Sequence, residues 1–329
     1  MTPIAALHTA TANAAEALGK SDRGVIAVGK PPVFLVKFIA SAALIASVYS
    51  LSAFTATVPR GVDRYSAAIT PRDTGIVPIK PETVTFSSGA LTLHGIVYRP
   101  TGTGPFTAIL FNHGSGTDYT PEVRAVGAVY ASLGYVFFAP SRRGQWLSAS
   151  AGRYILDSLD AIEKVRGKPA RDTLLVALMK GPQLDDVAAA LTWLKSQKFV
   201  NPNRVVIAGN SFGGIVTVLA SARLEGLYAA LDFAGAAQTW ASAPLLQAAM
   251  TDAATHARIP IFFGQAENDY DLTPSKALSA QMTAAQRPSV MKIFPPFGSS
   301  TPEGHSFGYF GGAIWGPAVA AFLASPPRT

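Results

Sequence analysis

The chain has 329 residues, 49% hydrophobic and 14% charged, a composition that excludes a largely disordered protein because disorder requires few apolar residues and a high net charge. It contains no cysteine, which excludes disulfide scaffolds, thiolate zinc sites and cysteine nucleophiles. The net charge is +7, but no run of basic residues is longer than Arg142–Arg143, so we expect a solubilising surface and no nucleic-acid partner.

The first feature along the chain is an apolar segment at residues 33–54, in which Lys37 is the only charged residue. Its uncharged part, residues 38–54, is at the short limit for crossing a membrane. Basic residues precede it, as is typical of a cytoplasmic flank: Lys20, Arg23 and Lys30. We therefore expect residues 1–58 to export the protein or to anchor it in a membrane, with an amphipathic helix packed on the domain as the alternative. The proline-containing residues 59–81 are predicted to form a linker.

Strand-like and helix-like stretches alternate after the linker. Alternating polar and apolar residues predict an antiparallel hairpin from residues 82–87 and 91–98. The later strands are mostly apolar, as expected for strands buried on both faces; they are predicted at residues 106–112, 135–139, 204–208, 228–233, 260–263 and 289–294. Helices are predicted between or after them, at residues 121–133, 184–194, 213–222 and 313–323.

This alternation predicts one α/β domain at residues 82–329, built on a mainly parallel, doubly wound sheet with antiparallel N-terminal strands. Residues 144–181 interrupt the alternation of strands and helices. We expect them to add helices that form a small cap over the site.

Residues 209–214 (GNSFGG) contain the pattern G-x-S-x-G between a predicted strand and a predicted helix. A serine hydroxyl becomes a useful nucleophile when a tight strand-to-helix turn exposes it beside a base. The flanking glycines permit such a turn, so Ser211 is the predicted nucleophile.

The base and the acid follow from chain order, because hydrolases with this motif place the acid and then the histidine after the serine. Among the five histidines, only His305 follows every plausible acid. We expect it in a loop between the last strand and the final helix. Asp269 lies just past the strand at 260–263 and is the preferred acid; Asp271 is the second choice, and Asp232 is the third.

Residues 113–116 (HGSG) follow the buried strand at 106–112. An oxyanion hole needs two preorganised N–H donors, one from the residue after the nucleophile and one from this loop. We predict the N–H groups of Phe212 and Ser115, with Gly114 as the alternative to Ser115. His113 is expected to brace the loop.

Two tryptophans are candidates for lining an acyl pocket: Trp146, in the predicted cap, and Trp240, after the strand at 228–233. Aromatic residues also commonly belong to the core. The chain has neither a phosphate-binding loop pattern nor H-E-x-x-H, and its histidines are scattered. The sequence therefore predicts no metal site and no bound nucleotide.

Five sequence blocks occur in order: HGSG, PSRRG at 140–144, GNSFGG, AENDYDLTP at 266–274 and EGHSFG at 303–308. Together they resemble the dienelactone hydrolase-like branch of the α/β-hydrolases over about residues 80–325. The resemblance implies an eight-stranded α/β-hydrolase fold, no cofactor, and hydrolysis of esters, lactones or related acyl compounds. Carried over by position, it makes Ser211, Asp269 and His305 the catalytic triad. The enzymes that give the branch its name use a cysteine nucleophile, whereas this chain has serine.

The leading hypothesis is a serine hydrolase acting on a small ester or lactone. A peptidase or amidase similar to the catalytic domain of prolyl oligopeptidases would use the same residues and is the enzymatic alternative. A catalytically inactive binding protein on the same fold is the alternative from another class.

Overall fold

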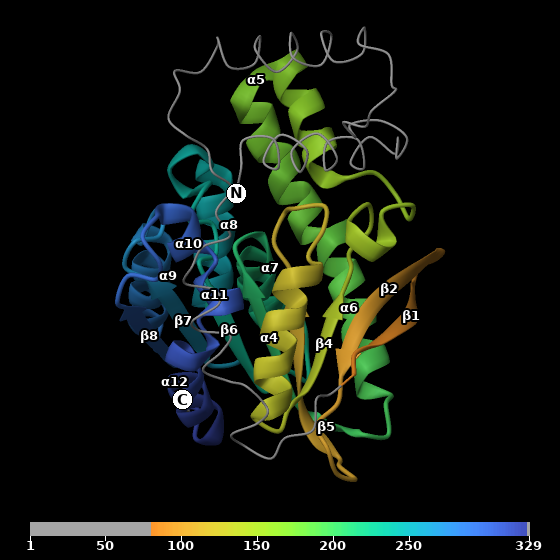
Figure 1. Cartoon of the computed structure of the whole chain (residues 1–329). Coiled ribbons are helices and arrows are strands. Elements are labelled where there is room, and N and C mark those ends of the chain that lie inside the picture. Colours follow the sequence, from red (N-terminus) through yellow and green to blue (C-terminus); the bar gives the residue numbers. More distant parts are fainter. Residues whose placement is uncertain (1–79, 328–329) are drawn as a thin grey trace, which may run out of the picture. The chain divides into compact units, whose positions relative to one another are not determined.

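The computed structural model describes residues 80–327. The predicted leader, its apolar segment and most of the predicted linker lie outside the described residues. From residue 82 onward the chain forms a sheet with helices on both faces (Figure 1).

The eight strands confirm the predicted strand positions, with ends that differ by a few residues. They are β1 (Glu82–Ser88), β2 (Leu91–Tyr98), β3 (Phe106–Asn112), β4 (Val136–Pro140), β5 (Val200–Asn210), β6 (Ala229–Phe233), β7 (Ile261–Ala266) and β8 (Ser289–Phe294). Their order in the sheet is β1-β2-β4-β3-β5-β6-β7-β8. The pairs β1–β2 and β2–β4 are antiparallel, and the remaining pairs are parallel. The mainly parallel sheet with antiparallel N-terminal strands is therefore confirmed.

Helices connect the strands: α4 (Thr120–Ser132), α5 (Ile155–Lys180), α6 (Pro182–Lys195), α7 (Phe212–Arg223), α8 (Pro244–Thr255), α9 (Thr273–Ala284), α10 (Thr301–His305), α11 (Phe307–Phe310) and α12 (Gly312–Ala324). Two short 3₁₀ helices, η1 (Trp146–Ser148) and η2 (Trp240–Ser242), lie in loops. Between residues 80 and 327, no helix has the length and apolar character needed to cross a membrane.

Residues 144–181 contain η1 and the long helix α5, which stands out from the rest of the domain in Figure 1. Helical geometry is broken inside α5 at Gly167, where φ is 76°, and Pro169 follows. Because proline cannot continue the helical hydrogen bonding of the preceding turn, this pair explains the kink. Helix α5 packs against α6, α7 and α8.

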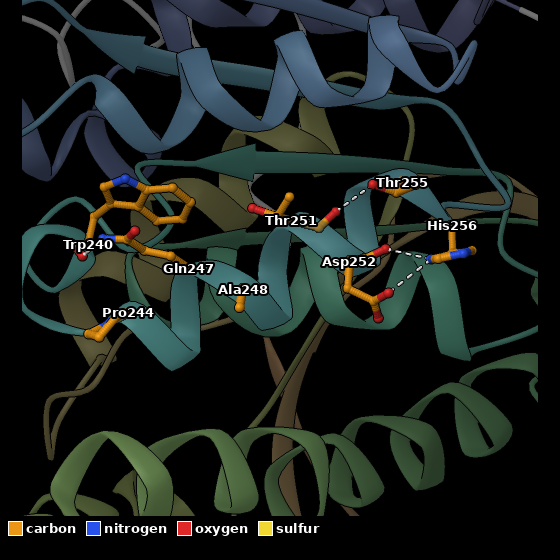
Figure 2. A pocket seen from close by; sticks show the side chains of 8 residues that line it. All are labelled: Trp240, Pro244, Gln247, Ala248, Thr251, Asp252, Thr255 and His256. Carbon is orange, nitrogen blue, oxygen red and sulfur yellow. Dashed lines mark hydrogen bonds and ion pairs between the residues drawn. The ribbon is translucent and has the colours of Figure 1, made fainter. Parts of the chain in front are cut away.

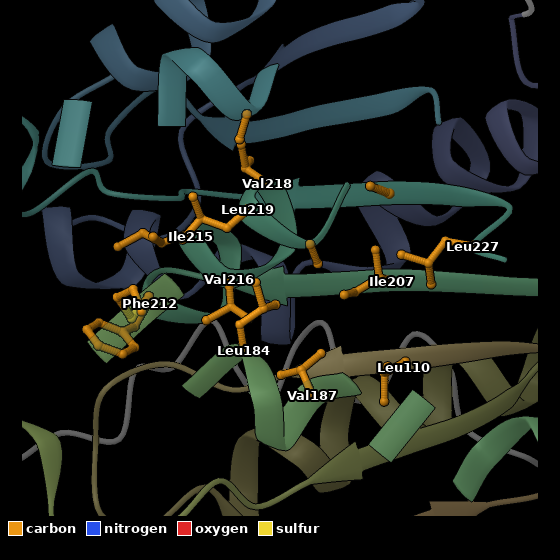
Figure 3. Close-up of a cluster of buried hydrophobic side chains, with 14 of the residues drawn as sticks. Leu110, Leu184, Val187, Ile207, Phe212, Ile215, Val216, Val218, Leu219 and Leu227 are labelled. Carbon is orange, nitrogen blue, oxygen red and sulfur yellow. The ribbon is translucent and has the colours of Figure 1, made fainter. Parts of the chain in front are cut away.

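Two separate hydrophobic clusters cover the two faces of the sheet. Along β3, Ala108 and Leu110 belong to one cluster, whereas Ile109 and Phe111 belong to the other. This alternation follows from the opposite directions of successive side chains in a strand. The first cluster includes residues of α5 to α9 and is shown around α7 in Figure 3; the second includes residues of α4, α11 and α12.

The topology determines where the chemistry is placed. Strands β3, β5, β6, β7 and β8 run parallel, so their carboxyl ends lie along one edge of the sheet. The HGSG loop follows β3, the G-x-S-x-G motif follows β5, and the loop containing Asp269 follows β7. Ligand sites of open α/β sheets lie at such an edge.

Candidate active site

Ser211 occupies a strained turn between β5 and α7. Its backbone angles are φ 58° and ψ −119°, which an L-residue adopts only when its surroundings impose them. The turn is tight: a Cβ atom on Gly213 would lie 1.9 Å from the carbonyl oxygen of Asn112, and one on Gly209 would lie 2.3 Å from that of Gly213. The Ser211 N–H donates to the carbonyl of Phe233 at 2.8 Å. These contacts explain why glycine is required on both sides of the serine.

The serine lies against a histidine and an aspartate. Ser211 Oγ is 2.8 Å from His305 Nε2, and His305 Nδ1 is 2.8 Å from Asp269 Oδ1. The His305 side chain is 12% exposed and that of Asp269 is fully buried. The structure thus brings the three predicted residues together in the order nucleophile, base and acid.

Of the three candidate acids, only Asp269 contacts His305. Asp271 instead accepts a hydrogen bond from the backbone N–H of Thr273, at the start of α9. Asp232 is buried at the end of β6 and accepts a bond from the N–H of Gly235. The geometry therefore separates Asp269 from the two alternatives that the sequence left open.

Gln265 orients Asp269, and the sequence analysis did not identify it. Its amide donates to Asp269 Oδ2 at 2.7 Å, while its Oε1 accepts from the hydroxyl of Ser275. The Tyr270 N–H donates to Asp269 Oδ1 at 2.6 Å. Gln265 is 1% exposed, and a buried amide in the otherwise apolar strand β7 was the available signal, because buried polar groups need partners.

The expected loop around His305 is wrong, because this residue ends the short helix α10. The helix is explained by its N-terminal sequence: Ser300 accepts a hydrogen bond from the N–H of Glu303, and the Glu303 carboxylate accepts from the Ser300 hydroxyl. Ser-x-x-Glu is a helix-start pattern, and Pro302 suits the first turn. The side-chain amide of Asn210 donates to the His305 carbonyl at 3.2 Å and ties this helix to the serine turn.

The N–H groups of Gly114, Ser115 and Gly116 differ in their partners. The Gly114 N–H donates to the hydroxyl of Tyr309 at 2.8 Å, and the Gly116 N–H donates to the hydroxyl of Tyr119 at 2.6 Å. Within residues 80–327 the Ser115 N–H makes no hydrogen bond, while its carbonyl accepts from the hydroxyl of Tyr154. Ser115 is therefore a better donor candidate than Gly114.

The second candidate donor is the N–H of Phe212. Phe212 is the first residue of α7, and the first N–H groups of a helix have no partner within it. The positive end of the helix dipole adds to the attraction for a negatively charged oxygen at this position.

The two tryptophans lie in different surroundings. Trp146 is half-buried beside the HGSG loop: its backbone N–H donates to the carbonyl of Thr117, its indole N–H donates to the hydroxyl of Thr120, and its ring centroid is 6.1 Å from that of His113. Trp240 is 8% exposed and belongs to the core cluster that includes Phe212.

Trp240 also lines a surface pocket of about 550 Å³ along α8, which Figure 2 shows. At the other end of this pocket, His256 Nδ1 lies 3.1 Å from Asp252 Oδ1. The lining does not include Ser211, His305 or Asp269.

Asp232 carries an unusual carboxyl group next to the serine turn. Burial raises the pKa of this carboxyl to about 7, and the nearby charge of Asp269 adds to the effect. Its Oδ2 has no hydrogen-bond partner among the described residues. Burial without a partner for this oxygen favours the protonated, uncharged form of the carboxyl.

His113 and Arg142 form a buried polar group behind the HGSG loop. Burial and the charge of Arg142 hold the pKa of His113 well below its usual range, so the ring is neutral. His113 stacks on Tyr119 at a centroid distance of 4.8 Å. The part of the chain that the structure describes contains no group of three or more histidine, aspartate and glutamate residues that could hold a metal ion.

The comparisons with known proteins identify the family of the chain. The model of the dienelactone hydrolase family matches residues 93–308, which is more than half of the chain. The chain belongs to the dienelactone hydrolase family. A curated relative, the quorum-quenching protein AidA of Acinetobacter baumannii, is 25% identical over 231 residues, which are 69% of each chain.

Solved structures show the same fold. A protein of Klebsiella pneumoniae named a putative dienelactone hydrolase has a TM-score of 0.55 and 16% identity, covering 76% of this chain and 100% of that one. The acylaminoacyl peptidase of Pyrococcus horikoshii has a TM-score of 0.58 and 16% identity, covering 77% of this chain. This chain spans only 42% of that peptidase. Est1E of Butyrivibrio proteoclasticus, solved with ferulic acid bound, has a TM-score of 0.53 and 15% identity, covering 73% of this chain and 98% of that one.

Proposed function

We propose that the protein is a serine hydrolase that cleaves carboxylic esters or lactones through an acyl-enzyme on Ser211. The observation that carries the proposal is the pair of 2.8 Å contacts that join Ser211 to His305 and His305 to Asp269. Covalent catalysis by serine requires a nucleophile, a base within hydrogen-bond reach and a third group that orients the base. Membership of a hydrolase family supports the same reaction class.

Acylation begins with proton transfer from Ser211 Oγ to His305 Nε2 as the oxygen attacks the substrate carbonyl. Asp269 holds the imidazole by its Nδ1–H and stabilises the positive charge that the ring acquires. The N–H groups of Phe212 and Ser115 bind the carbonyl oxygen, which becomes negatively charged. His305 then returns the proton to the leaving alcohol as the C–O bond breaks, and the acyl group remains on Ser211.

Deacylation repeats these steps with water as the nucleophile. His305 accepts a proton from the water, which attacks the acyl carbonyl, and the proton passes to Ser211 Oγ as the ester bond to the enzyme breaks. The products are a carboxylic acid and the regenerated serine. For a lactone, the leaving alcohol and the acid belong to one molecule.

The substrate class rests on the chemistry of the site and on the relatives. An ester or lactone has a better leaving group than an amide and demands less of His305 as a general acid. The relative named as a quorum-quenching protein adds a reason to include lactones and quorum-sensing signals among the substrates tested. The acylaminoacyl peptidases share only the fold at this identity, so amide cleavage is an outcome that the assay must be able to detect.

Hydrolysis of p-nitrophenyl esters of increasing acyl length, lactones and aminoacyl amides tests the proposal. Wild type and Ser211→Ala are compared, with Ser221→Ala on the same helix as the control, because Ser221 is buried and, among the described residues, its hydroxyl donates only to the carbonyl of Val218. We expect ester or lactone turnover that is lost in Ser211→Ala and kept in Ser221→Ala. Comparable rates in wild type and Ser211→Ala would refute the proposal, and amide turnover equal to ester turnover would replace it with a peptidase.

A further inference from the structure

The feature that the mechanism leaves unused is the buried cation Arg142, which follows β4. Its side chain is 1% exposed, although arginine is rarely buried unless it is paired. Within residues 80–327 no ion pair joins Arg142 to a carboxylate. Burial lowers the pKa of the guanidinium to about 10, so it still carries its charge at neutral pH. A buried charge without a counter-ion is costly, which raises the question of what it does.

Arg142 is bound to the backbone of the HGSG loop. Its Nη2 donates to the carbonyls of His113 and Gly114, each at 2.8 Å, and its Nε donates to the side chain of Gln183 at 3.0 Å. The Nη1 atom has no partner among the described residues. The charge is thus directed at loop carbonyls.

The Gly114 carbonyl has further polar neighbours. Its oxygen is 3.0 Å from Nδ1 of the neutral His113 ring, and that Nδ1 lies 3.3 Å from Arg142 Nη2. The amide of Gln145 donates to the same oxygen at 3.4 Å. A guanidinium, an imidazole and an amide therefore surround this one carbonyl.

This carbonyl shares its peptide unit with the N–H of Ser115. In a trans peptide the C=O and the N–H point in opposite directions, so fixing the Gly114 oxygen on Arg142 also fixes the direction of the Ser115 N–H. Hydrogen bonds to the carbonyl polarise the peptide and strengthen its N–H as a donor. The guanidinium carbon also lies 5.7 Å from the ring centroid of Phe212, the residue that carries the other candidate donor.

We propose that Arg142 is a positioning residue of the oxyanion hole, which fixes and polarises the Gly114–Ser115 peptide and places a positive charge behind the oxygen that becomes negative. The inference rests on the proposed function, because it assumes that Ser115 and Phe212 bind this oxygen. It differs from a purely structural role in one respect: Arg142 then contributes to binding of the transition state and not only to folding.

The experiment uses the full chain with Arg142→Lys and Arg142→Met, and with Arg143→Met as the matched control. Arg143 is the neighbouring arginine, but it forms an ion pair with Asp186 at 2.6 Å, and within residues 80–327 its side-chain hydrogen bonds go to Asp186 and not to the HGSG loop. Three quantities are measured: kcat and KM for a short p-nitrophenyl ester, and the inhibition constant of an alkyl boronic acid. The boronic acid forms a tetrahedral adduct with serine, whose negatively charged oxygen occupies the oxyanion hole.

For Arg142→Met we expect kcat to fall by about 10- to 100-fold, somewhat less than the loss of a direct oxyanion donor. KM should change little, and boronate affinity should fall in parallel with kcat. Arg142→Lys should show a smaller, parallel loss, because one ammonium cannot keep the bonds to Gln183 and to both carbonyls. Arg143→Met should unfold more easily but retain kcat and boronate affinity.

A folded Arg142→Met protein with wild-type kcat and boronate affinity would overturn the inference, as would equal losses in Arg143→Met. If Arg142→Met does not fold, the inference is tested with Arg142→Lys. Wild-type kcat and boronate affinity in that variant would overturn the inference. These outcomes differ from failure of the proposed function, in which Ser211→Ala would remain active.

Discussion

At the scale of single residues, Asp269 and Asp271 lie two positions apart in the loop after β7 but have different hydrogen-bond partners. Asp269 contacts His305, whereas Asp271 bonds the backbone of Thr273. We expect Asp269→Asn to lower turnover by roughly 10⁴-fold, the effect of the corresponding change in a triad protease. Asp271→Asn should cost little. Ester hydrolysis by the two variants checks this, and the reverse ranking would assign the orienting role to Asp271.

Asp232 leads to a prediction about pH and stability. Its pKa is about 7 in the folded protein and about 3.9 in an unfolded chain. Between these values the folded state keeps a proton that the unfolded chain releases, so the free energy of unfolding falls as the pH rises from about 4 to about 7. Asp232→Asn cannot ionise and should escape this loss.

The difference in unfolding free energy between Asp232→Asn and wild type should therefore move in favour of the variant on going from pH 4 to pH 8. At 1.36 kcal/mol per pKa unit, the change is about 4 kcal/mol at most. Urea denaturation at the two pH values measures it. A difference that does not depend on pH would mean that this carboxyl titrates normally.

At the scale of elements, the turn between β5 and α7 depends on close backbone contact. A methyl group on Gly213 would collide with the Asn112 carbonyl, so Gly213→Ala should push α7 away from β3. We expect a loss of about 3 kcal/mol or more, the upper range for overpacked sites, together with reduced turnover. Thermal unfolding and ester hydrolysis measure both effects.

Ala222→Gly near the end of α7 is the control for that variant. It should destabilise the helix by about 1 kcal/mol and leave the turn and the turnover unchanged. If Gly213→Ala behaved like this control, the close contact at the turn would have no functional importance.

Comparing the helices and strands with the sequence shows which features of the fold and the site could be predicted. Strands buried on both faces are apolar runs, so the positions of β3 to β7 could be read directly; β8 is an edge strand, exposed at Val290 and Met291. The base could be identified because His305 is the only histidine that follows every plausible acid in the sequence. The helix that carries His305 was missed because the pattern Ser300-x-x-Glu303 is short. The role of Arg142 depends on a contact between two loops that are distant in sequence, with Gly114, which no local pattern contains. Gln265 is only four residues from Asp269, but the sequence does not show which group its buried amide bonds.

At the scale of the whole molecule, the sequence divides into a catalytic part and an N-terminal part. Every motif lies between residues 113 and 308, and we propose that residues 1–58 direct the protein to a membrane or across it. Lys37 is near the amino end of the apolar segment, where a lysine can extend to the membrane surface at a smaller cost than at the centre.

A chain that begins at Gly61 should therefore have the specific activity of the full chain and lose its membrane association or export. Cell fractionation together with ester hydrolysis measures both properties. An inactive, aggregated shortened chain would show that the apolar segment belongs to the folded domain.

The central claim is that Ser211 is a nucleophile activated by His305, and covalent labelling tests it most directly. The folded full chain is treated with a fluorophosphonate, which reacts with activated serines, and the modified peptide is identified by mass spectrometry. We expect one label per chain, on Ser211, and none in His305→Ala. An unlabelled folded protein, or a label on another residue, would contradict the claim and favour a binding protein that has kept the fold without the reaction.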